Sequence, residues 1–136
     1  MIYPQICRVK LTIEPAINVE VLLTTNWNQR LQSIGGGGFA GFIPFNSLAV
    51  AAKSGYVVAG TNTRNAGNVT NGEFVYKDGK LQADLITDFA YRSVHEMTIK
   101  TKQIIESYYG QAPDYSYWNG CSTGGHQGLG GSKVPC

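Results

Sequence analysis

A serine set between glycines, directly after an aromatic segment, is the part of this chain that points most clearly to chemistry. The segment Gly120–Gly124 reads Gly-Cys-Ser-Thr-Gly, which fits the Gly-x-Ser-x-Gly pattern of a sharp turn from a strand into a helix. Such a turn strains the backbone of the serine and leaves no room for side chains two residues away on either side. The pattern predicts that Ser122 exposes a nucleophilic hydroxyl, although five residues alone also fit an ordinary glycine-rich turn.

A serine nucleophile needs a histidine to take its proton and a carboxylate to orient that histidine. In folds with this turn the chain order is serine, acid, histidine, yet the 14 residues after Ser122 contain no Asp or Glu, and His126 is their only histidine. The ring of His126 would run along the side of the expected helix instead of over the serine hydroxyl. We expect structural roles for His126 and for His95, so the catalytic set within this chain is predicted to be incomplete.

A second glycine-rich segment follows an expected strand at Arg30–Ile34. The residues Gly36–Gly41 satisfy Gly-x-Gly-x-x-Gly, but a dinucleotide fold also needs an acidic residue about 20 positions later. The first acidic residue after this loop is Glu73, so a dinucleotide site is not expected. Glycines can instead bring backbone N–H groups close to a developing oxyanion, because no Cβ stands in the way.

We expect one donor of this oxyanion hole to be the N–H of Thr123, the residue after the nucleophile. The expected second donor is Gly37, with Gly38 as the alternative.

The elements that must position these two loops alternate between strand and helix. An opening antiparallel strand pair is followed by further strands, a short helix, a loop with a small hairpin, a long helix and the strand before the serine. The predicted bounds in chain order are Arg8–Ile13, Val19–Thr24, Arg30–Ile34, Asn46–Lys53, Tyr56–Thr61, Phe74–Leu81 for the hairpin, Thr87–Tyr109 and Tyr115–Trp118. This alternation predicts an α/β fold with a mostly parallel sheet and an antiparallel N-terminal strand pair.

Composition limits the partners of the chain. At 136 residues it forms one domain at most. Its net charge is +2, from 11 basic and 9 acidic residues without a basic cluster, which argues against nucleic acid as a partner. No apolar run approaches the length of a membrane span, and the first 20 residues lack the apolar core of a signal peptide. We therefore expect a small-molecule partner.

The longer motifs add a resemblance to a known family. Gly120–Gly125 with Gln127–Leu129 resembles the nucleophile signature of the tannase and feruloyl esterase family, and Trp27–Gly41 is similar to its strand and oxyanion loop. Gly55–Ala59 and the helix that holds His95 follow the family pattern in order, so the resemblance covers about residues 7 to 129. It implies a secreted α/β-hydrolase that cleaves phenolic esters, such as those of ferulate or gallate, with Ser122 as the nucleophile.

The resemblance also implies that much of the enzyme is missing from this chain. Residues 1–129 would be the N-terminal part of an α/β-hydrolase catalytic domain, and residues 130–136 a divergent tail whose glycines break the helix after the serine. The later strands, the catalytic Asp and His, and the lid with its calcium would be absent, so we expect no cofactor or metal in this chain and no activity from it alone. The alternative is a non-catalytic remnant that serves as a binding or structural protein.

The cysteines and one asparagine bear on the same question. The resemblance implies that Cys121 pairs with a cysteine beside the catalytic histidine, and that Cys7 pairs with a cysteine outside this segment. A free buried cysteine is the alternative for both. Three cysteines cannot all pair within one molecule, and Asn68 lies in a glycosylation sequon that would suit a secreted protein.

Overall fold

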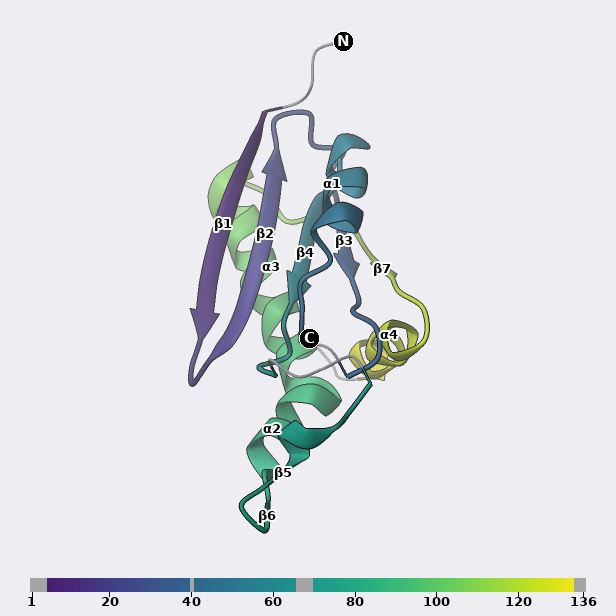
Figure 1. Cartoon of the computed structure of the whole chain (residues 1–136). Coiled ribbons are helices and arrows are strands. Elements are labelled where there is room, and N and C mark those ends of the chain that lie inside the picture. The colour runs from purple at the N-terminus through teal and green to yellow at the C-terminus, as the bar shows by residue number, and fades with distance from the viewer. Residues whose placement is uncertain (1–4, 40, 66–69, 134–136) are drawn as a thin grey trace.

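A five-stranded sheet with helices on both faces forms the body of the protein in the computed structural model (Figure 1). The structure describes residues 5–39, 41–65 and 70–133, with only the backbone of residues 132 and 133. The strand order is β1-β2-β4-β3-β7. The strands are β1 (Ile6–Ile13), β2 (Ile17–Thr24), β3 (Arg30–Ile34), β4 (Val57–Thr61) and β7 (Tyr115–Asn119).

The sheet is mixed, and the expectation of a mostly parallel sheet is wrong. β1 pairs with β2 and β2 with β4 in the antiparallel sense, whereas β3 runs parallel to both β4 and β7. The predicted antiparallel opening pair is confirmed, but its second strand lies directly beside β4 and continues the antiparallel half to the centre of the sheet. Parallel pairing is confined to the strands that helical crossovers connect, as the geometry of such connections requires.

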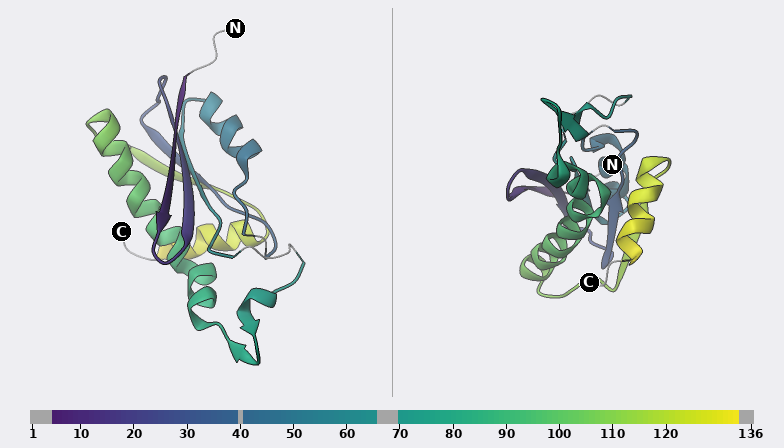
Figure 2. Two further views of the ribbon diagram at one scale, coloured as in Figure 1. Left: turned by 60° about the vertical axis from the view of Figure 1, so that its left-hand side comes forward. Right: turned by 90° about the horizontal axis from the view of Figure 1, so that it is seen from below.

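Helices cover both faces of this sheet, with α1 (Phe45–Lys53) on one side and α3 (Ser93–Tyr109) on the other (Figure 2). The helical path to α3 begins earlier than predicted, because α2 (Ala83–Thr87) and a π-helical turn (Asp88–Arg92) lead into it without a break. Its predicted end is confirmed at Gly110, whose φ of 75° closes the helix in the left-handed conformation that glycine favours.

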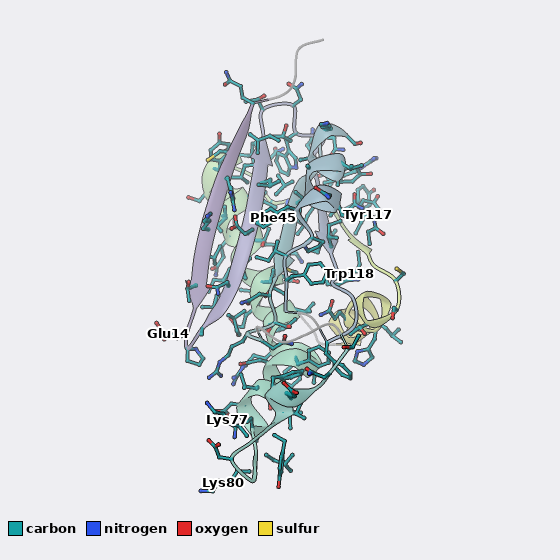
Figure 3. The ribbon with its side chains drawn as sticks, in the orientation of Figure 1. Glu14, Phe45, Lys77, Lys80, Tyr117 and Trp118 are labelled. Atoms are coloured by element: carbon teal, nitrogen blue, oxygen red, sulfur yellow. The ribbon has the colours of Figure 1, made fainter. Side chains whose placement is uncertain are left out.

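The small hairpin is also where the sequence predicts it. A short 3₁₀ turn (Glu73–Val75) leads into β5 (Tyr76–Lys77) and β6 (Lys80–Leu81). This hairpin projects away from the sheet, with Lys77 and Lys80 at its end (Figure 3).

Alternation along the strands creates one core on each face of the sheet. The core under α3 includes Val21, Leu23, Leu31, Met97 and Ile105, and the core under α1 includes Leu22, Val58, Leu48 and Ala52. β4 is buried along its whole length, which explains why its sequence is continuously apolar instead of alternating. Because β3 runs parallel to both β4 and β7, the carboxyl ends of these three strands meet at one edge of the sheet.

The helix after the serine, α4 (Thr123–Lys133), contradicts the predicted break at Gly130–Gly131. Its glycines allow close packing on the elements around it. A Cβ on Gly128 would collide with the ring of Trp118, and one on Gly131 would lie 3.2 Å from Cγ1 of Val94. These tertiary contacts maintain the helix although each interior glycine costs about 1 kcal/mol of helix propensity.

Candidate active site

Ser122 lies at the junction between β7 and α4 in a strained backbone conformation. Its φ is 54°, a region that residues other than glycine rarely adopt. The carbonyl of Ser122 accepts the N–H groups of Gly125 at 3.0 Å and His126 at 3.2 Å, which starts the helix directly after it. The residue is exposed to solvent. This is the sharp strand-to-helix turn that the sequence predicts.

Glycine is required on both sides of this turn for a steric reason. A Cβ on Gly120 would lie 2.7 Å from the backbone carbonyl of Gly124. A Cβ on Gly124 would in turn lie 2.5 Å from the carbonyl oxygen of Gly36. The predicted need for glycine two residues before and after Ser122 is therefore confirmed.

The glycine loop after β3 lies against the turn because β3 and β7 are parallel neighbours. A Cβ on Gly35 would be 2.7 Å from Cα of Gly124, so the two backbones are in direct contact. A pocket of about 310 Å³ opens between the loop and the turn. Its lining combines Ile34, Gly35, Gly36, Gly37, Phe42, Ser47, Asn119, Gly120, Cys121 and Ser122. The fold thus brings Gly37 and Ser122 to one cavity.

Two of the loop's N–H groups already have partners. Gly35 donates to the carbonyl of Asn119 at 2.9 Å, and Gly36 donates to Oε1 of Gln127 at 3.1 Å. Among the described residues, the N–H groups of Gly37, Gly38 and Thr123 have no hydrogen-bond partner. Gly37 and Thr123 are therefore available as oxyanion donors, a role that stays a prediction.

The two histidines lie on different helices. His126 is exposed on α4, and His95 is half-buried on α3. In the part of the chain that the structure describes, no hydrogen bond joins either imidazole ring to Ser122. This arrangement supplies a nucleophile and backbone donors without a bonded base, and the structural roles expected for both histidines stay predictions.

A buried carboxylate stabilises the neighbouring part of the same sheet edge. The Asp88 side chain is fully buried in the π-helical turn, where its Oδ2 accepts a bond from Nη1 of Arg64 at 2.9 Å and its Oδ1 from Nε of Arg92. The hydrogen bond to Asp88 raises the pKa of Arg92. This cluster was not predicted, because its one local signal is the i,i+4 spacing of Asp88 and Arg92.

Two further bonds, one at the turn and one between α4 and the glycine loop, have no counterpart among the predicted contacts. Nε1 of Trp118 donates to the carbonyl of Gly124 at 2.7 Å, and Gln127 holds the N–H of Gly36. Figure 3 shows Trp118 on the strand that leads to α4. Both bonds depend on tertiary proximity, so no sequence spacing indicates them.

Both described cysteines are exposed and free, which makes the alternative of buried cysteines wrong. Cys121 lines the pocket beside Ser122, and Cys7 lies on β1. The pairings that the resemblance implies stay predictions, and Asn68 and Cys136 lie outside the described residues.

The described residues contain neither a metal-binding cluster nor a membrane-spanning helix. No three His, Cys, Asp or Glu side chains gather to hold a metal ion there. Within the same residues, every helix is too short or too polar to cross a bilayer.

Comparison with known proteins gives a consistent result. The family model described as "Tannase and feruloyl esterase" matches residues 4–133. The probable feruloyl esterase B-2 of Aspergillus flavus is 36% identical over 128 residues, which cover 91% of this chain and 23% of that protein.

Solved structures agree with this match. The crystal structure of feruloyl esterase B from Aspergillus oryzae superposes with a TM-score of 0.80 and 35% identity, over 90% of this chain and 24% of that one. The tannin acyl hydrolase of Aspergillus niger gives a TM-score of 0.77 at 25% identity, over 92% and 25%. The chain thus spans about a quarter of the length of the relatives it matches.

Proposed function

Because the chain belongs to the tannase and feruloyl esterase family, we propose that it carries the nucleophile and oxyanion hole of a serine carboxylic ester hydrolase with a partial α/β-hydrolase fold. The observation that carries this proposal is the strained conformation of Ser122, which lies at the mouth of a pocket it shares with Gly37. A positive φ at a non-glycine residue persists only where the surrounding structure maintains it.

In the proposed reaction, Oγ of Ser122 attacks the ester carbonyl carbon while its proton passes to a histidine. The carbonyl oxygen becomes an oxyanion that accepts hydrogen bonds from the N–H groups of Gly37 and Thr123. Removal of one such donor typically costs about 10²- to 10³-fold in kcat. The alcohol then leaves with the proton, and water releases the acid from the serine. The histidine and its carboxylate partner would come from sequence that this chain does not contain.

We propose a phenolic ester, of the ferulate or gallate type, as the substrate. The printed names of the relatives support this class, since they include feruloyl esterases and a tannin acyl hydrolase. The exposed ring of Phe42 on the pocket wall provides an apolar surface for a flat aromatic acid. We also propose that the protein is secreted. The calcium that the resemblance implies would bind outside the described residues, which do not fit it.

The experiment is hydrolysis of methyl ferulate and methyl gallate by a chain extended to the length of the curated relatives. Ser122→Ala should lower kcat by about 10⁴-fold or more. Ser116→Ala, which removes an exposed hydroxyl from the same strand, should leave kcat unchanged. Equal rates for the parent and Ser122→Ala would overturn the proposal. The 136-residue chain alone should show no Ser122-dependent turnover.

A binding protein without catalysis is the second candidate, favoured by the lack of a hydrogen bond from either imidazole ring to Ser122 within the described residues. This second function predicts that ferulate binds saturably but its esters are not hydrolysed, both in the 136-residue chain and in the extended chain. Calorimetric titration with ferulate, together with the rate measurement, separates the two functions.

A further inference from the structure

One side chain of α4 reaches across to the glycine loop. Gln127 is 5% exposed, and its Oε1 accepts the N–H of Gly36 at 3.1 Å, between residues 91 positions apart in the chain. From this contact we propose that Gln127 is the positioning residue of the oxyanion loop. The inference rests on the proposed function, because it concerns the donor that the reaction would use.

The loop needs such a support because its glycines have no side chains of their own to fix it. The N–H of Gly35 is bound within the sheet to Asn119, which leaves Gly36 as the first residue beyond the ladder. An amide N–H can bond only to the oxygen of the glutamine amide, so the orientation of the Gln127 head group is determined by chemistry. The loop thereby acquires one hydrogen bond from a side chain of α4.

Gly36 is held from a second direction as well. Its carbonyl oxygen lies against α4, so close that a Cβ on Gly124 would be 2.5 Å away. That carbonyl belongs to the same planar peptide unit as the N–H of Gly37. Gln127 and Gly124 therefore fix the peptide units on both sides of Gly36, and the second of these carries the expected oxyanion donor.

The same helix also holds the nucleophile, because α4 begins directly after Ser122. A bond from α4 to the loop couples the position of the donor to that of the nucleophile. Trp118 fixes the turn from the sheet side through its 2.7 Å bond to Gly124, whereas Gln127 is the side chain that reaches the loop. Loss of the Gln127 acceptor should loosen the loop and leave the turn in place.

The experiment is amide hydrogen exchange measured by NMR on the uniformly ¹⁵N-labelled 136-residue chain. Gln127→Met keeps the length of the side chain and removes the acceptor, so the Gly36 amide should exchange about tenfold faster or more. The Gly35 amide, bound to Asn119, is the internal reference and should keep its rate. Gln127→Glu retains an acceptor oxygen and should restore the protection of Gly36. His126→Met, an exposed neighbour on α4, is the matched control and should change neither amide.

Two results would overturn the inference. Equal Gly36 exchange in the parent and in Gln127→Met would show that the bond does not hold the loop. Faster exchange of Gly35 and Gly36 together in Gln127→Met would show general loosening of the fold instead of positioning.

Kinetics of the extended chain give a second readout. Gln127→Met should lower kcat on methyl ferulate about tenfold or more with little change in KM, because the donor acts in the transition state. Gln127→Glu places a carboxylate beside the hole, so the ratio of its kcat to that of the parent should rise as the pH falls and that carboxyl takes up a proton, a dependence that a purely structural role would not produce. If Ser122→Ala leaves hydrolysis unchanged, the proposed function fails, while the exchange result still decides whether Gln127 positions the loop.

Discussion

The contact between α4 and the glycine loop predicts that alanine has opposite effects on the free energy of unfolding at the adjacent positions Gly124 and Gly125. In Gly124→Ala the new Cβ would lie 2.5 Å from the Gly36 carbonyl oxygen and 3.2 Å from the carbonyl carbon of Gly35. Both neighbours are backbone atoms, so neither can rotate away as a side chain would. In Gly125→Ala the nearest atom is the carbonyl oxygen of Gly120 at 3.5 Å, an ordinary van der Waals contact.

The expected magnitudes follow from two opposing terms. Overpacking of a tight contact costs about 1–3 kcal/mol, and glycine to alanine within a helix gains up to about 1 kcal/mol. Gly124→Ala should therefore lower the free energy of unfolding by about 1–2 kcal/mol. Gly125→Ala should leave it unchanged or raise it by up to about 1 kcal/mol, because only the propensity term remains.

The assay is urea denaturation followed by circular dichroism at low protein concentration, with the midpoint and slope fitted for the parent and both variants. A lower midpoint for Gly124→Ala alone, at an unchanged slope, is the expected result. If Gly124→Ala is as stable as Gly125→Ala, the backbone of the loop does not lie against α4, and the basis for the oxyanion hole is lost.

Three further predictions concern the rest of the fold. Asp88→Asn should lower the free energy of unfolding by about 2–3 kcal/mol. This is somewhat less than the cost of removing one partner from a fully buried ion pair, because Arg64 and Arg92 can still reach water. The exposed Asp114→Asn, in the segment before β7, is its control, and equal urea midpoints for the two variants would contradict the role of the cluster. Burial raises the pKa of Tyr109 to about 12, and its hydroxyl donates to the carbonyl of Thr24 at 2.7 Å. A tyrosine in the unfolded chain loses its proton at about pH 10. Above that pH the unfolded state therefore binds fewer protons than the folded state, so the free energy of unfolding should fall between about pH 10 and about pH 12. In urea titrations across this range, Tyr109→Phe should reduce the loss of stability, whereas the exposed Tyr108→Phe should not. An equal loss of stability in Tyr109→Phe and the parent would contradict this role of Tyr109. Finally, β7 is paired on one side only within the described sheet and presents exposed tyrosines without a protecting charge, so the chain should self-associate as its concentration rises. Light scattering should then give a molar mass nearer the monomer's 14.7 kDa for Tyr117→Lys than for the control Tyr76→Lys, and a parent that stays monomeric at all concentrations would refute this.

Local signals in the sequence were sufficient for most elements and for the turn at Ser122. β-branched and aromatic runs predict the bounds of β3 and β4 to within a residue, and Gly110 ends α3 where expected. The turn was predictable because the glycines it requires lie within five residues of sequence, even though the atoms that exclude a Cβ at Gly124 belong to the distant Gly35 and Gly36. The long helix was predicted to begin too late, at Thr87 instead of Ala83, since a π-helical turn around the buried Asp88 has no clear local signature.

The parts that could not be predicted depend on residues far apart in the chain. The place of β2 beside β4 is decided by the packing of two cores, which strand periodicity does not encode. The persistence of α4 through Gly130 opposes local propensity, and its cause is contact with Trp118 and Val94. The bond between Gln127 and Gly36 likewise appears only once β3 and β7 are adjacent. In each case a tertiary contact outweighs or adds to the local signal.

The most direct test of the central claim is to trap the acyl-enzyme on the extended chain. A nitrophenyl ester of ferulic acid releases its phenol quickly, so acid quenching after a short reaction should catch the ferulate on the enzyme. Mass spectrometry of the digested protein should then find one feruloyl group on Ser122, and none in Ser122→Ala. Hydrolysis that proceeds in Ser122→Ala, or a feruloyl group found on another residue, would contradict the assignment of Ser122 as the nucleophile.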